Sequence, residues 1–193
     1  AAGLTPYLEP PGSESLASLR DPLWQQINYP RIRSIYPPVA QWLFRATYEL
    51  NDSLRAFQLM AVLGDLLVVG LLLACLSRWG LPRWRVALYA LSPVVAVEFA
   101  SSGYFDPWVM AAVLAAIWLH LDGRPVLSTL ALGVGILLKS WPVVFVPLLL
   151  RRRPPWHVPL LVGAIALAFL PYVDAGLRIL QPWLDYTGRW LFN

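Results

Sequence analysis

The chain has 193 residues, of which 58% are hydrophobic and 13% are charged, and its mean hydropathy is +0.57. A soluble globular domain holds about 45–50% apolar and about 25% charged residues. The composition therefore excludes an ordinary soluble domain and predicts an all-α, polytopic transmembrane helical protein. The net charge of +4 comes largely from arginines in short loops, which indicates membrane topology and not nucleic-acid binding. A single cysteine, Cys75, excludes an intrachain disulfide and a multi-cysteine zinc site.

Residues 1–50 are the least hydrophobic part of the chain, with prolines at positions 6, 10, 11, 22, 30, 37 and 38. These prolines forbid a long early helix and predict a proline-rich outer loop. After Pro38, apolar residues recur at three- and four-residue steps as far as Tyr48, which predicts a helix on the membrane interface. We therefore expect two domains, a periplasmic or extracytoplasmic loop with an interfacial helix at 1–50 and a transmembrane helical domain at 51–193.

The first membrane span is expected at residues 56–77, which carry a single charge, Asp65. The next apolar run, 86–100, carries Glu98 and is short, because a span needs about 20 residues. Residues 101–106 break the run, and a helix is predicted from Pro107 to about Leu121 with Asp106 as its N-cap.

A turn at 122–125, an apolar stretch at 126–150 and a last span at 156–173 complete a set of about five membrane segments, and an amphipathic segment ends the chain. The chain opens without an initiator Met and stops at Asn193 without a tail. We therefore expect a fragment that is truncated at both ends.

The stretch 126–150 has two interpretations, which the surrounding charges help to distinguish. The loops with Arg78, Arg83, Arg85 and Arg124 are expected in the cytoplasm, and the base-free break at 101–106 is expected outside. One straight span would then place the basic run 151–153 outside. We therefore favour a re-entrant hairpin of two short helices that turns near residues 139–142, since broken helices are tolerated where they line a protein-buried or wet cavity.

Lys139 is the only lysine of the chain and lies in an apolar stretch. An ammonium at the centre of a membrane helix costs about 2.5–3.5 kcal/mol by insertion scales. Either its head reaches the interface along an apolar stem, or it meets a ligand phosphate or an ion-pair partner in a polar cavity, and we favour the second. The stretch from Gly133 to Ser140 nearly matches a P-loop, but Leu138 replaces the glycine before the lysine and no buried strand precedes it, so we exclude a nucleoside triphosphate site.

Three carboxylates accompany this lysine. Glu98 and Asp106 flank the break at the outer end of two apolar runs, where they would bind a metal, a sugar hydroxyl or an acceptor that they activate. The simpler alternative is a helix cap for Asp106 and an interfacial position for Glu98. For Asp65, at mid-span, we favour a structural pair with an arginine or a polar helix neighbour. No nucleophile triad and no metal-ligand spacing is evident, so we expect neither a metal nor a cofactor.

Six motifs occur in order: Gly3-Leu-Thr-Pro-Tyr7, Trp24-Gln-Gln-Ile-Asn28, Ile35-Tyr-Pro-Pro-Val-Ala-Gln41, Ser92-Pro-Val-Val-Ala-Val-Glu98, Gly103-Tyr-Phe-Asp106 and Leu138-Lys139-x-x-Pro142. This succession resembles the bacterial GT-C glycosyltransferases, especially the polyprenyl-phosphate-sugar-dependent, mannosyltransferase-like enzymes, over essentially the whole chain. The resemblance implies a multi-pass protein of the bacterial cell membrane. It would transfer a hexose from a polyprenyl-phosphate donor to an acceptor on the outer face by an inverting reaction, and mannose is the expected sugar.

The resemblance also implies which residues bind the donor or substrate: Lys139, Asp106, Glu98, Tyr36, Gln41 and Tyr104, with Lys139 near the donor phosphate. Thr5 and Tyr104 depart from the Asn and His that are usual in the family. The family's acidic motif lies just upstream of residues 3–7, so the catalytic base is expected before residue 1 and this fragment is expected to be inactive. Glu9, Glu14 or Asp21 would substitute only if the family pattern does not hold. The implied partners are the lipid-linked donor and membrane lipid.

Two other functions remain open at this point. A membrane transporter or lipid flippase would use Asp65, Glu98 and Lys139 as an intramembrane charge pathway and the hairpin as a broken helix. An inverted internal repeat would favour that function, and none is evident in the sequence. The third possibility is a noncatalytic membrane scaffold.

Overall fold

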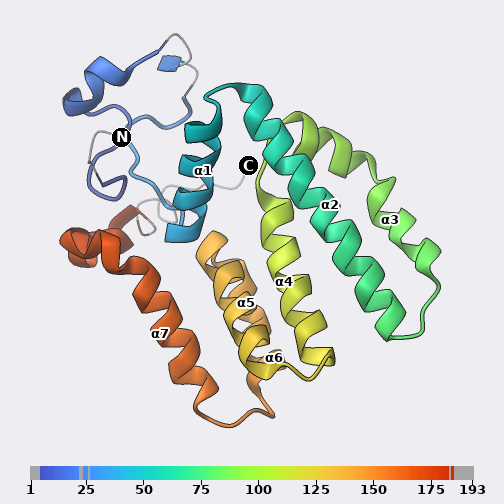
Figure 1. Cartoon of the computed structure of the whole chain (residues 1–193). Helices are drawn as coiled ribbons and strands as arrows, with labels where there is room; N and C mark the ends of the chain where they lie inside the picture. The colour runs from blue at the N-terminus through green and yellow to red at the C-terminus, as the bar shows by residue number, and fades with distance from the viewer. Residues whose placement is uncertain (1–4, 22–23, 26, 183, 185–193) are drawn as a thin grey trace. The chain divides into compact units, whose positions relative to one another are not determined.

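The computed structural model describes residues 5–21, 24–25, 27–182 and 184, and all regular elements within them are helical (Figure 1). The expected all-α class is therefore confirmed for the described residues. The chain forms two compact units, one from the described parts of 1–36 and 169–193 and the other from 37–168. The division into an outer loop at 1–50 and a membrane domain at 51–193 concerns sidedness in the membrane and stays a prediction.

The smaller unit shows how a proline-rich segment folds compactly with little regular structure. Its helical pieces are η1 (Glu14–Leu19) and η6 (Leu170–Leu180). The side chain of Tyr7 is 2% exposed, its ring meets the edge of Tyr172 at 5.0 Å between centroids, and its hydroxyl donates to the carbonyl of Tyr36 at 2.7 Å. At Gly12 the amide donates to the carbonyl of Pro30, and a Cβ here would lie 2.9 Å from that oxygen, so only glycine fits without a shift.

The larger unit is a helical bundle. Its elements are α1 (Pro38–Leu50), α2 (Leu54–Arg78), η3 (Arg83–Val86), α3 (Ala87–Ala90), η4 (Val95–Ser101), α4 (Asp106–Leu121), α5 (Pro125–Leu138), η5 (Trp141–Phe145), α6 (Val146–Leu150) and α7 (His157–Phe169), whose last residue belongs to the smaller unit. Helix α4 packs against α2 on one side and α5 on the other (Figure 1).

Two helical stretches of the described chain, α2 and His157–Leu180, are long and apolar enough to cross a membrane. The pair η4 and α4, bent by 110° at its break, would be a third span. The predicted spans at 56–77 and 156–173 fall on these stretches.

Helix α1 begins where the sequence predicts, because Pro37 and Pro38 end the extended segment and proline is well accommodated in a first helical turn. Pro38, Ala40 and Thr47 are buried, whereas Trp42 is 41% exposed and Tyr48 is 62% exposed. The helix is therefore amphipathic, and its position on the membrane interface stays a prediction.

The stretch 126–150 folds as a hairpin. Helix α5 ends at Leu138, Lys139 is extended (φ −155°, ψ 143°), and η5 and α6 run back beside α5 (Figure 1). Leu132 and Leu150 belong to one buried cluster, although a straight helix at 1.5 Å per residue would separate them by roughly 27 Å. The doubling back that the charges favour is therefore confirmed.

Candidate functional site

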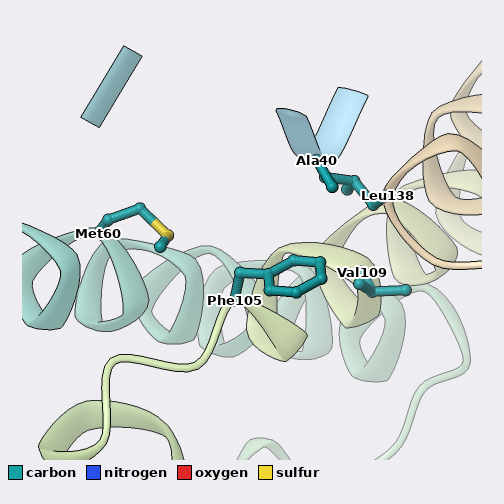
Figure 2. Close-up of a cluster of buried hydrophobic side chains, with 5 residues drawn as sticks. All are labelled: Ala40, Met60, Phe105, Val109 and Leu138. Carbon is teal, nitrogen blue, oxygen red and sulfur yellow. The ribbon is translucent and has the colours of Figure 1, made fainter. Parts of the chain in front are cut away.

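An apolar cluster holds the candidate site in place. Figure 2 shows its members, which come from α1, α2, the start of α4 and the end of α5: Ala40, Met60, Phe105, Val109 and Leu138. Phe105 is 5% exposed and Leu138 is 3% exposed. Phe105 directly precedes Asp106, and Leu138 directly precedes Lys139. Burial of the two apolar side chains in one cluster therefore brings the two charged residues together at its edge.

Lys139 and Asp106 form an ion pair. The Nζ of Lys139 donates to Oδ1 of Asp106 at 2.7 Å, and the two side chains are 41% and 30% exposed. The same Nζ lies 5.7 Å from the ring centroid of Phe105, within the range of a cation–π interaction. The ammonium thus has one carboxylate partner and one aromatic face, and its exposed fraction leaves it accessible to a ligand.

The backbone explains why Lys139 stands at the apex of the hairpin. Its amide donates to the carbonyl of Gly135 as the last bond of α5, and its extended conformation then releases the chain into η5. A proline one to three residues beyond the C-terminus of a helix favours such a stop, and Pro142 lies buried in η5, three residues after the C-cap Lys139. The sequence pattern Leu-Lys-x-x-Pro therefore has a local structural reason as well as a place in the family resemblance.

The predicted N-cap role of Asp106 is wrong. Phe105 occupies the N-cap of α4 and makes no capping bond through its side chain, and Asp106 is the first helical residue. Its carboxylate accepts from Lys139 instead. A negative charge in a first helical turn is still favourable for the helix dipole, so the position suits both interactions.

Glu98 lies in η4, and Tyr104 lies on the bend between η4 and α4. Element η4 is a π-helix, a form often found at functional sites. Gly103 permits the bend because its φ is +70°, a region that residues with a Cβ rarely adopt. Glu98 is exposed and makes no hydrogen bond or ion pair through its carboxylate among the described residues, and Tyr104 is 52% exposed.

The six predicted site residues are thus placed differently. Lys139 and Asp106 touch, Tyr104 directly precedes the buried Phe105, and Gln41 follows Ala40 on the helix that packs against the end of α5. Glu98 lies across the bend. Tyr36 belongs to the smaller unit, where it is 37% exposed and accepts a hydrogen bond from Tyr7 at its carbonyl.

Glu9, one of the acids considered as a substitute base, is already bound. Its Oε2 accepts from the hydroxyls of Ser13 and Ser15. These hydrogen bonds hold the pKa of the Glu9 carboxyl below its ordinary value, and the charge of Arg33 acts in the same direction. A carboxylate with a lowered pKa is a weaker proton acceptor, so the structure argues against this substitution.

Asp65 has a structural partner, as favoured from the sequence. The hydroxyl of Tyr89 in α3 donates to its Oδ1 at 2.5 Å, and Asp65 is 8% exposed. The pair joins α3 to α2. Sequence analysis missed Phe105 as a neighbour of Lys139 and the buried pair of Thr129 and His157, joined at 2.8 Å. Among the described residues no group of three His, Cys, Asp or Glu side chains is placed to hold a metal ion.

Comparison with known proteins identifies a family. The family model described as Glycosyltransferase family 87 matches residues 35–192 of the chain. The matched region contains the hairpin, the ion pair and the bend at 101–105, and it fits the resemblance to GT-C glycosyltransferases that the six motifs carry. No curated protein and no solved structure matches the chain.

Proposed function

The chain belongs to glycosyltransferase family 87, and we propose that this membrane glycosyltransferase uses a polyprenyl-phosphate-linked hexose as its donor. Mannose is the sugar that the motif resemblance favours. The acceptor would be bound at the end of the bundle where Lys139 lies, which charge counting assigns to the outer face. Among the residues that the structure describes, no feature favours a transporter or a scaffold function.

The observation that carries the proposal is the ammonium of Lys139 at the hairpin apex. A lipid-linked sugar phosphate has its charge at the boundary between apolar and aqueous surroundings, and a cation is needed at that depth. Lysine offers a compact point charge with three donors, of which Asp106 occupies one. The 41% exposed side chain leaves the remaining donors for phosphate oxygens.

Asp106 and Phe105 then have positioning roles. A half-exposed ion pair contributes at most about 1 kcal/mol to stability, so folding alone gives little reason for a charged pair at the edge of an apolar cluster. The carboxylate and the ring instead restrict where the ammonium lies, which lowers the entropic cost of binding a phosphate there. Because Oδ1 of Asp106 is already engaged by Lys139, we assign this residue to the donor side and not to proton abstraction.

Other residues would contact the sugar and the isoprenoid tail of the donor. Glu98, with an open carboxylate on the π-helix, and Tyr104, with a half-exposed ring, would contact hydroxyls of the sugar or the acceptor, and Gln41 and Tyr36 would complete the binding residues. The isoprenoid tail needs an apolar surface, and α2 offers one: Leu59, Leu63 and Leu66 are 59%, 47% and 62% exposed.

The experiment is a transfer assay on the full-length membrane protein, reconstituted in vesicles. It compares three mannose donors that differ only in the activating group: polyprenyl monophosphate, polyprenyl diphosphate and a nucleoside diphosphate. The proposal expects transfer from the monophosphate, and glucose on the same lipid tests the sugar. Transfer only from the nucleotide donor would refute the lipid-linked donor.

A further inference from the structure

The end of the bundle opposite Lys139 carries an excess of arginine. Hydrogen bonds between elements define this end: both Nε and Nη2 of Arg78 donate to the carbonyl of Leu121, and Nη2 of Arg153 donates to Nδ1 of His120 at 2.8 Å. These bonds join the end of α2, the end of α4 and the exit of the hairpin (Figure 1).

We call this region the arginine end and define it by residues 77–86, 119–125 and 150–157. Its seven arginines are Arg78, Arg83, Arg85, Arg124, Arg151, Arg152 and Arg153, and its single acid is Asp122. Seven positive charges and one negative charge leave a net charge of +6. The whole chain carries only +4, so the other described and masked parts together are acidic by two charges.

The arginines divide into engaged and open side chains. Arg78 and Arg153 hold helix ends together, and Arg124 pairs with Asp122 at 2.8 Å. Arg83 donates to the hydroxyl of Ser77 at 3.2 Å. Arg85, Arg151 and Arg152 are exposed and form no hydrogen bond or ion pair with any described residue. Arg151 and Arg152 are therefore adjacent in the sequence and directly precede Arg153, which is hydrogen-bonded to His120. The one acid of this end, Asp122, already pairs with Arg124 and is not left to neutralise them.

Exposed tryptophans indicate at which depth of the membrane these arginines lie. Trp79, Trp84 and Trp156 are 52%, 68% and 49% exposed, and each lies within a few residues of an arginine. Indole rings favour the headgroup level of a bilayer, and α7 begins its apolar run directly after Trp156. The open guanidinium groups thus belong at headgroup depth, where a soluble acidic protein or a nucleic acid would reach them less readily than a lipid.

We propose that the arginine end binds the phosphate headgroups of anionic phospholipids, with Arg151 and Arg152 as the principal contacts. Guanidinium groups bind phosphate oxygens in a bidentate manner, and basic residues next to a membrane segment attract anionic lipid. Charge counting assigns this end to the cytoplasmic leaflet. The interaction concerns the membrane at the opposite end from the donor site and is independent of the proposed sugar transfer.

The test measures the selectivity of the full-length protein for spin-labelled phosphatidylglycerol over spin-labelled phosphatidylcholine, by electron paramagnetic resonance in mixed vesicles. The variant Arg151→Gln/Arg152→Gln is compared with Arg45→Gln/Arg55→Gln, which removes the same charge from two exposed arginines of α1 and α2 near the other end. We expect the first variant to lose up to about fivefold in selectivity for each arginine, and the second to keep the selectivity of the parent.

Each outcome of this measurement either supports or overturns the proposed lipid binding. Equal losses in the two variants would mean a response to net charge alone and would overturn the proposal, as would an unchanged ratio in both. Loss confined to Arg151→Gln/Arg152→Gln, and weakened in the parent by high salt, supports it. Both variants alter exposed side chains, and an unfolding midpoint equal to that of the parent shows that a lost selectivity is not lost structure.

Discussion

Gly64→Ala tests the packing of α2 against α4. A Cβ at Gly64 would lie 2.8 Å from Cδ1 and 2.9 Å from Nε1 of Trp108, and 3.0 Å from Cβ of Pro107. Such overpacking costs about 2 kcal/mol. The shift of the indole also endangers the bond from Nε1 of Trp108 to the carbonyl of Met60 at 2.8 Å, which is worth about 1 kcal/mol. Alanine regains about 1 kcal/mol of helix propensity, so we expect a net loss of about 2 kcal/mol.

Gly70→Ala is the matched control on the same helix. Nothing lies within 4 Å of a Cβ at Gly70, so only the gain of up to about 1 kcal/mol in propensity is expected there. The assay is unfolding in mixed micelles with increasing dodecyl sulfate, followed by circular dichroism. The free energies of unfolding of the two variants should differ by about 2–3 kcal/mol, with Gly64→Ala less stable than the parent and Gly70→Ala more stable. Equal stabilities would refute the close approach of α2 and α4.

Two further predictions concern the hairpin and the proline-rich unit. Cysteines at Leu132 and Leu150, in a Cys75→Ala background, should react with one short bifunctional reagent because the two side chains share a buried cluster; a straight span would hold them roughly 27 Å apart and prevent the cross-link. Ser13→Ala should raise the pKa of the Glu9 carboxyl, whose largest lowering comes from that hydroxyl. Since the folded pKa of Glu9 is depressed, its contribution to stability is present above the unfolded pKa and is lost as the pH falls through the folded pKa; an NMR titration that finds the same pKa in the variant would contradict the bond.

The helices and the hairpin could be predicted because single residues and charge balance decide them. Prolines 37 and 38 set the start of α1, as the structure confirms. The basic run 151–153 would lie on the outer side if 126–150 formed a straight span, so the charges predicted a hairpin. In the structure α6 does return beside α5. Both signals are local or follow from a topology rule, so no knowledge of the tertiary contacts was needed.

The partners of the charged residues were harder to predict because tertiary packing selects them. In the sequence Asp106 stands directly before Pro107, where a capping residue is expected. The sequence does not reveal that Phe105 and Leu138 share a cluster that brings Lys139 to the carboxylate of Asp106. The partner of Asp65 was predicted only as an arginine or a polar neighbour, and in the structure it is Tyr89 of the short helix α3. Loop geometry between short helices decides such pairs.

The most direct test of the central claim, that Lys139 binds the donor phosphate, is the affinity of the full-length Lys139→Ala protein for a polyprenyl-phosphate-linked mannose, measured by calorimetry. A lost charged hydrogen bond of about 1.5–3 kcal/mol predicts a Kd raised about 10- to 100-fold. The control Arg45→Ala removes an exposed cation, paired with Glu49 on α1, and should leave the Kd unchanged. A folded Lys139→Ala protein that binds the donor as tightly as the parent would contradict the account.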